Sequence, residues 1–259
     1  MNVKNAISLF KVDKLKVEIY PDRLSMGRQA ALAVGEKLKI LTSMQLNVRI
    51  VFAAAPSQNE FLSELASTKG INWSRVTAFH MDEYIGLNND AEQRFGNFLK
   101  IRIFDKVNFK KVNYINSQAE NPNGECKRYS KLLNENPIDI VCLGIGENGH
   151  IAFNDPPFAD FNDTKTVKIV KLDDVSRQQQ VNDGCFASIE EVPKEAITLT
   201  IPAMFSAKYL FTVVPGLTKK TAVYKTLKGE INTDCPATIL RKHDSAVLYL
   251  DSQSASKIY

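Results

Sequence analysis

Two adjacent carboxylates, Asp82 and Glu83, directly follow the apolar run RVTAFHM. Partial burial at the end of a strand raises the pKa of a carboxylate toward neutrality, where it can act as a general base on a substrate carbon. The same pair would also suit a helix N-cap or a solvated turn, and without further context that structural role is the more common one. The pair therefore has two interpretations: it supplies a base that transfers a proton, or it forms a polar turn.

His150 lies in the stretch LGIGENGHIAFNDPP and is one of three histidines in the chain. An imidazole changes its charge near neutral pH, which suits the transfer of a proton to a ring oxygen. Gly146 and Gly149 would let the backbone approach a ligand closely. Asn148 and Asp155 are near enough in sequence to orient the ring and fix its tautomer. A polar turn with an incidental histidine is the alternative.

Two other kinds of site are disfavoured by the sequence. The segment GIGENG matches the dinucleotide fingerprint G-x-G-x-x-G, but two prolines follow too soon for a helix over a pyrophosphate and the strand comes late in the chain. The three histidines are scattered, without a carboxylate or cysteine at ligand spacing. We therefore expect no nucleotide cofactor and no metal.

The apolar pattern around these stretches alternates between strands and helices. Strands are predicted at LKVEIY, NVRIVFAAA, RVTAFHM, KVNYI, IDIVCLGIG, AITLTI, KYLFTVV and SAVLYL, with TKTVKIVKL as an edge strand or hairpin. Helices are predicted over residues 23–42, 92–104 and 122–135, and at PSQNEFLSELAS and LTKKTAVYKTLKG. This alternation predicts an α/β, Rossmann-like fold with a largely parallel sheet and helices on both faces.

In such a sheet, ligands bind at the carboxyl ends of the strands. Three predicted loops leave those ends with unusual residues: AAAPSQ, HMDEYIGL and GENGHIAFNDPP. We expect these loops to meet and form one site.

Composition limits the class of protein. The chain has 259 residues, of which 44% are apolar and 24% charged, as is typical of a globular protein; a single domain over residues 1–259 is expected, with residues 1–22 as an N-terminal extension. The net charge of +4 comes from interspersed residues and predicts no nucleic-acid or membrane partner. The four cysteines form no CxxC pair, and the first residues make a poor signal peptide, so a cytoplasmic location is expected.

The motifs VTAFHMDEYIGL and LGIGENGHIAFNDPP together resemble the glucosamine-6-phosphate deaminase family, a sugar-phosphate isomerase group related to the 6-phosphogluconolactonases. Weaker likeness extends from about residue 24 to residue 251. The resemblance implies an enzyme that isomerises an amino-sugar phosphate from aldose to ketose and releases ammonia, with no redox cofactor and no obligatory metal. It implies a small-molecule sugar phosphate as partner and a homo-oligomer as an expectation.

The resemblance also implies roles for individual residues. Asp82 matches the carboxylate that takes the C2 proton of the ring-opened sugar, and His150 matches the ring-opening histidine. Asn148 and Asp155 match the partners of that histidine, and Lys219 matches a lysine that binds the substrate phosphate. Further substrate contacts are expected from Ser57, Gln58, Glu83, Gly146, Gly149 and Arg177.

The residues expected to bind the substrate phosphate depart from the family pattern. The family has a Gly- and Thr-rich loop where this chain has AAAPSQ, and alanine adopts positive φ less readily than glycine. Ser57 and Gln58 would still donate hydrogen bonds there. The family's arginine has no clean counterpart, because Arg177 is slightly out of register and Asn182 stands near the expected position. Many members have aspartate in place of Asn148, and glutamate is usual in place of Asp155.

Three alternatives stay open on the sequence. A close variant would act on another amino sugar, such as galactosamine-6-phosphate. A lactonase-type hydrolase is the second, although MDEY and HIAFN match the deaminases better. The third is a non-catalytic sugar-phosphate sensor, which would have no need of a base and a proton-transferring histidine.

Overall fold

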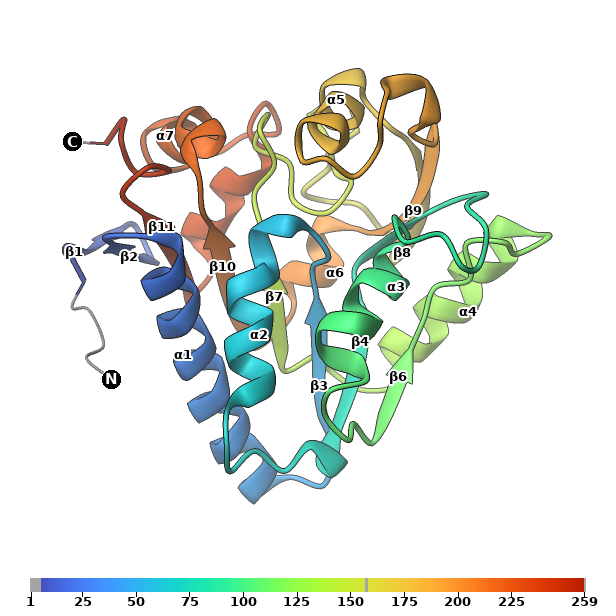
Figure 1. Ribbon diagram of the computed structural model, residues 1–259, viewed down its shortest axis with the longest axis horizontal. Helices are drawn as coiled ribbons and strands as arrows, with labels where there is room; N and C mark the ends of the chain where they lie inside the picture. The colour runs from blue at the N-terminus through green and yellow to red at the C-terminus, as the bar shows by residue number, and fades with distance from the viewer. Residues whose placement is uncertain (1–5, 157, 259) are drawn as a thin grey trace.

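The computed structural model describes residues 6–156 and 158–258, and its centre is an eight-stranded sheet (Figure 1). Every neighbouring pair of strands in this sheet is parallel except the pair at the N-terminal edge, which is antiparallel. The order across the sheet is β1 (Ser8–Val12), β2 (Leu15–Tyr20), β11 (Ala246–Asp251), β10 (Tyr209–Val214), β7 (Ile140–Leu143), β3 (Val48–Phe52), β4 (Val76–His80) and β6 (Lys111–Asn113).

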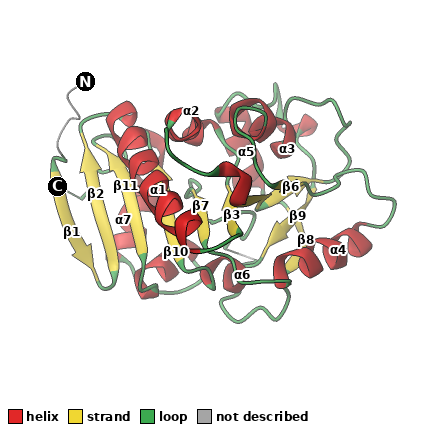
Figure 2. Cartoon of the chain, turned by 90° about the horizontal axis from the view of Figure 1, so that it is seen from below, coloured by secondary structure: helices red, strands yellow, loops and turns green. Residues whose placement is uncertain are grey.

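Helices cover both faces of this sheet, as predicted. Figure 2 shows α1 and α2 on one face and α4, α6 and α7 on the other. Side chains alternate between two apolar cores along each buried strand, so that Val51 packs in one core and its neighbours Ile50 and Phe52 pack in the other. The helices are α1 (Arg23–Met44), α2 (Asn59–Ser67), α3 (Phe95–Leu99), α4 (Pro122–Asn134), α5 (Asp174–Asn182), α6 (Ile201–Phe205) and α7 (Lys220–Lys228).

Short helical turns connect several of these elements. A π-helical turn, η3 (Lys100–Phe104), continues α3, and the others are 3₁₀ turns. They are η1 (Pro56–Gln58), η2 (Trp73–Arg75), η4 (Ile189–Glu191), η5 (Leu217–Lys219) and η6 (Pro236–Lys242). Among the described helices, none combines the length and the apolar character needed to cross a membrane.

A second, three-stranded antiparallel sheet stands beside the carboxyl ends of β3 and β4 (Figure 1). Its order is β5 (Asp82–Tyr84), β9 (Glu195–Leu199) and β8 (Val167–Lys171). Met81 links the two sheets, because its N–H donates to Phe52 O at 3.2 Å and its carbonyl accepts from Leu199 N at 2.8 Å. The sequence predicted the strands at β8 and β9 but not this separate sheet, and it read the first residues of β5 as a turn.

The predicted N-terminal extension over residues 1–22 is corrected by the structure. The chain enters the main sheet at Ser8, and β2 runs parallel to β11 with Val17 opposite Leu248. Apolar and polar residues alternate in LKVEIY, so Leu15, Val17 and Ile19 are all buried on one face of the sheet. This burial holds the segment in the main sheet. From Ser8 onward this segment is therefore part of the domain. Residues 1–5 lie outside the described residues.

Candidate active site

The three loops expected to meet do form one cavity at the carboxyl ends of β3, β4 and β7. Its volume open to a water-sized sphere is about 60 Å³, well below the roughly 300–1,000 Å³ usual for ligand pockets. The lining residues are Ala53, Ala54, Ala55, Ser57, Met81, Asp82, Phe95, Gly144, Ile145, Gly146, His150, Ala152, Phe153, Gln179, Gln180 and Lys219.

Asp82 is the first residue of β5, lies opposite Thr198 of β9, and lines this cavity. Its side chain is largely buried, and burial, reinforced by the neighbouring charge of Glu83, raises the pKa of Asp82 well above its ordinary value. A carboxyl group in this condition is a stronger base than an exposed one once it is ionised. That property suits removal of a proton from carbon.

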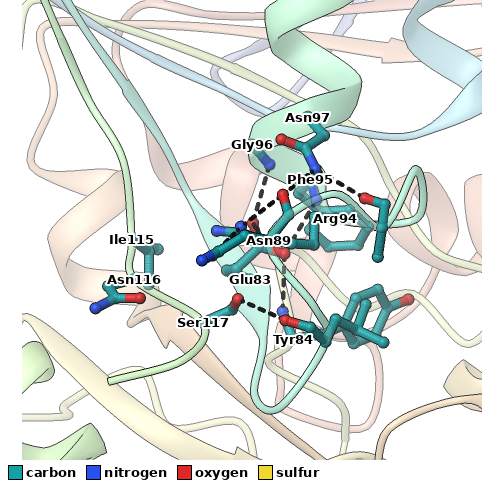
Figure 3. A network of polar contacts seen from close by, with 12 residues as sticks. Glu83, Tyr84, Asn89, Arg94, Phe95, Gly96, Asn97, Ile115, Asn116 and Ser117 are labelled. Atoms are coloured by element: carbon teal, nitrogen blue, oxygen red, sulfur yellow. Dashed lines mark hydrogen bonds and ion pairs between the residues drawn. The ribbon is translucent and has the colours of Figure 1, made fainter. Parts of the chain in front are cut away.

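The neighbouring carboxylate, Glu83, points the other way, because successive side chains alternate across a strand. Its carboxylate accepts N–H groups from Tyr84 at 3.1 Å, Phe95 at 3.0 Å and Gly96 at 2.9 Å, and Arg94 Nε lies 3.8 Å away (Figure 3). Burial raises the pKa of Glu83 to about 7, although these partners oppose the shift. The carboxylate of Glu83 thus binds the start of α3 and does not line the cavity, and its contact with substrate stays a prediction.

His150 is held by the two partners predicted for it. Its Nδ1 lies 2.8 Å from Asn148 Oδ1 and 2.9 Å from Asp155 Oδ1, while Asn148 Nδ2 donates to the same Asp155 oxygen at 2.9 Å. Because both neighbours of Nδ1 are acceptors, Nδ1 carries the proton and Nε2 keeps its lone pair. Burial acts to raise the pKa of Asp155, but the charge and hydrogen bonds of His150 and Asn148 outweigh it and bring the pKa below its ordinary value.

The two glycines before the histidine have different roles. Gly146 lines the cavity, and a Cβ there would lie 2.1 Å from His150 Cε1 and 2.3 Å from Nε2. Gly149 has φ +90° and a Cβ there would meet Cys235 Sγ at 2.4 Å, so this glycine is required by the fold of the loop. Ala152, which the sequence did not single out, also adopts positive φ, at 48°.

The histidine loop is attached to the small sheet as well. Phe153 N donates to Thr198 Oγ1 at 3.1 Å, and Asn154 Nδ2 donates to Leu199 O at 2.9 Å. Thr198 is also the residue opposite Asp82 on β5. Strand β9 is therefore in contact with both the candidate base and the loop of the candidate proton carrier.

Lys219, in η5, supplies a cationic group to the cavity lining. It is buried, and burial lowers its pKa despite the charges of Asp183 and Glu147. Ser57 lines the cavity beside the AAAPSQ loop. Gln58 does not line it, because its Nε2 donates to Val213 O at 3.0 Å and to Ser57 Oγ at 3.1 Å; its contact with substrate stays a prediction.

Among the described residues, no group of three histidine, cysteine, aspartate or glutamate side chains is arranged to hold a metal ion. A larger hollow of about 620 Å³ lies between the C-terminal end of α4 and α6. It contains no histidine and is away from the carboxyl ends of the central strands. The cavity described above thus brings together a carboxyl group, an imidazole and a buried ammonium group.

Comparison with known protein families matches residues 21–249 to the family described as glucosamine-6-phosphate isomerases/6-phosphogluconolactonase. The chain belongs to this family. A glucosamine-6-phosphate deaminase of Bacillus cereus is 36% identical over 210 residues, covering 81% of this chain and 78% of that protein. One from Lactobacillus delbrueckii subsp. bulgaricus is 32% identical over 248 residues, covering 93% and 99%.

Solved structures agree with the family assignment. A monomeric glucosamine-6-phosphate deaminase superimposes with a TM-score of 0.84 at 27% identity, over 93% of this chain and 98% of the other. A 6-phosphogluconolactonase from Thermotoga maritima gives a TM-score of 0.75 at 18% identity, over 92% and 100%. At that identity the second likeness shows a shared fold only.

The part of the cavity wall formed by α5 has glutamines where the family resemblance led us to expect an arginine. Arg177, predicted to contact substrate, donates through its guanidinium to Asp174 Oδ1 at 3.0 Å and to Val192 O at 3.1 Å and is not among the residues that line the cavity; its contact with substrate stays a prediction. Gln179 and Gln180 line the cavity in its place. The run RQQQ is the feature of the sequence that could have indicated these glutamines. Side-chain amides are buried on a helix face only when they form hydrogen bonds to a ligand or to the protein.

Proposed function

We propose that the protein isomerises and deaminates an amino-sugar 6-phosphate, with glucosamine-6-phosphate as the first candidate and the galactosamine compound as the second. The products are a ketose 6-phosphate and ammonia, and one water is consumed. The observation that carries this proposal is the placement of Asp82, His150 and Lys219 around one cavity. Relatives named glucosamine-6-phosphate deaminase support the choice of substrate.

The proposed reaction begins with ring opening. His150 Nε2 holds a lone pair, because Nδ1 donates to Asn148 and Asp155. It can therefore take the proton of the anomeric hydroxyl and return it to the ring oxygen. Asn148 and Asp155 fix the ring and stabilise the imidazolium that forms between the two transfers.

Asp82 then acts on the open chain. Its carboxylate removes the C2 proton, a C1–C2 double bond forms, and the π electrons of the C1 carbonyl move to O1, which takes up a proton from water. The nitrogen lone pair then forms the C2–N double bond as the proton on Asp82 returns to C1, and loss of one N–H proton to water leaves an imine at C2. Water adds to this carbon and ammonia leaves, which gives the ketose. Burial of Asp82 supports this role, since a raised pKa makes the ionised carboxylate a better base.

We place the phosphate at the Lys219 end of the cavity, with the hydroxyl of Ser57 and the amides of Gln179 and Gln180 as further donors. Burial of Lys219 supports this, because a buried ammonium group is stabilised by an anion that binds beside it. Glutamine amides would replace the family's arginine by hydrogen bonding without charge. The free cysteines support a cytoplasmic setting, and the oligomeric state stays a prediction.

The test is ammonia release and ketose 6-phosphate formation from glucosamine-6-phosphate by the purified protein. Galactosamine-6-phosphate and 6-phosphogluconolactone serve as parallel substrates, and the Asp82→Asn variant serves as the matched control. Turnover of either amino sugar that is lost in the variant supports the proposal. Turnover of the lactone alone would replace the deaminase assignment with the hydrolase, and binding without any turnover would favour the sensor.

A further inference from the structure

His80, the last residue of β4, is fully buried two residues before the candidate base. Its Nε2 lies 2.9 Å from Ile115 N, and its Nδ1 lies 2.8 Å from the main-chain carbonyl of Asp82. A backbone N–H can only donate, so Nε2 must be the acceptor in the first contact. Nδ1 therefore carries the proton and donates it to Asp82 O.

The carbonyl of Asp82 needs such a donor because β5 is the edge of the small sheet. In an antiparallel pair, consecutive residues direct their backbone groups alternately toward and away from the partner strand. Met81 O accepts from Leu199 N at 2.8 Å and Ile85 N donates to Glu195 O at 3.1 Å, so Asp82, one residue after Met81, directs its carbonyl away from β9. That side of the strand is where His80 stands.

His80 is itself firmly placed. Its backbone N–H donates to the hydroxyl of Tyr129 at 3.0 Å, and that hydroxyl lies 2.9 Å from His80 O. Burial lowers the pKa of His80 to about 4, so the ring stays neutral and keeps this tautomer throughout the neutral range. A neutral donor on a fixed backbone is suited to holding another backbone group and adds no charge beside the base.

We propose that His80 is a positioning residue for the base: by binding the main-chain carbonyl of Asp82, it sets the direction in which that carboxylate enters the cavity. The inference rests on the proposed function of Asp82. It assigns to His80 no contact with substrate. Displacing a reacting group by about 1 Å can cost on the order of 100-fold in rate, so a backbone contact of this kind has a measurable effect on turnover.

Two substitutions test the hydrogen bonds of the two ring nitrogens of His80 separately. In His80→Asn the side-chain amide nitrogen can occupy the place of Nδ1 and keep the bond to Asp82 O, while the bond to Ile115 N is lost. In His80→Gln the amide oxygen can occupy the place of Nε2 and keep Ile115 N, while the bond to Asp82 O is lost. Each variant thus loses one buried hydrogen bond, and a loss of stability of similar size is expected in both.

The measurement is kcat and KM of both variants with the amino-sugar phosphate that the wild-type protein turns over, together with amide hydrogen exchange of Leu199 and Ile85 as reporters of β5. We expect kcat of His80→Gln to be at least 10-fold below that of His80→Asn, with KM within about 3-fold and faster exchange at both amides. A residue with a structural role only would lower kcat equally in both variants, and that result would overturn the inference.

Failure of the proposed function gives a different result. A wild-type protein that releases no ammonia from any amino-sugar phosphate would remove the role of Asp82 as base, and the inference would fall with it. Turnover by the wild type with equal kcat in the two variants would leave the proposed function in place and overturn the role of His80 alone.

Discussion

Replacement of Gly146 by alanine tests whether the histidine ring is held as described. Gly146 does not adopt positive φ, so alanine is compatible with its backbone conformation. The added Cβ would lie 2.1–2.4 Å from three atoms of the His150 ring, which is closer than any van der Waals contact. The ring must therefore leave its place, and its hydrogen bonds to Asn148 and Asp155 are lost with it.

The size of the effect follows from these contacts. Overpacking a buried site costs about 1–3 kcal/mol, and loss of the His150 donor to the buried carboxylate of Asp155, which still accepts from Asn148 Nδ2, costs about 1–3 kcal/mol more. The free energy of unfolding should fall by about 2–6 kcal/mol by this sum. Loss of a positioned proton carrier should lower kcat by about 100- to 10,000-fold.

Chemical denaturation and ammonia release measure the two effects. The control is Gly146→Ala in a His150→Ala background, where no ring is present and the added methyl group should cost little further stability. The two substitutions are thus expected to be strongly non-additive. If Gly146→Ala destabilises both backgrounds equally, or leaves turnover intact, the described contact between Gly146 and the ring is wrong.

Three further predictions concern the carboxylates and the cation. Asp82→Asn should lower kcat by about 100- to 10,000-fold while substrate still binds, as titration calorimetry would show; full activity would contradict its role as base. Lys219→Ala should raise KM for a phosphorylated substrate by about 10- to 100-fold, because a charged hydrogen bond contributes about 1.5–3 kcal/mol; an unchanged KM would place the phosphate elsewhere. Glu83 has a pKa of about 7 in the fold against an ordinary 4.5, so the folded state binds the extra proton between these values. Its contribution to the free energy of unfolding should therefore fall as pH rises from 4.5 to 7, by about 1.4 kcal/mol per pH unit at most. Glu83→Gln should lack that slope in urea titrations, and an identical slope would refute the assignment.

The sequence was sufficient for the main architecture and for the meeting of the three loops. Apolar runs such as NVRIVF and IDIVCL have the length and residue types of buried parallel strands, and their carboxyl ends must lie at one edge of the sheet. Asp82 and His150 could be placed together for that reason, whereas Lys219 was assigned to the site only through the family resemblance. The partners of His150 could also be predicted, because Asn148 and Asp155 are close to it in the sequence.

The sequence was not sufficient where tertiary contacts decide the direction of a side chain. Strand β5 is three residues long and reads DEY, which is too short and too polar to show a period of two. Without that period, the sequence could not show that the side chains of Asp82 and Glu83 point in opposite directions. Gln58 is bound by the carbonyl of Val213, 155 residues away, and no local pattern predicts such a contact. Arg177 is bound by Asp174 and by the carbonyl of Val192 in the segment after α5.

Strand β9 carries none of the proposed chemistry, yet it is paired with the strand of Asp82 and bonded to the loop of His150. The placement of Asp82 relative to the His150 loop therefore depends in part on this segment. A slip of one residue between β5 and β9 would exchange the two adjacent carboxylates, bringing Glu83 to the cavity and turning Asp82 away.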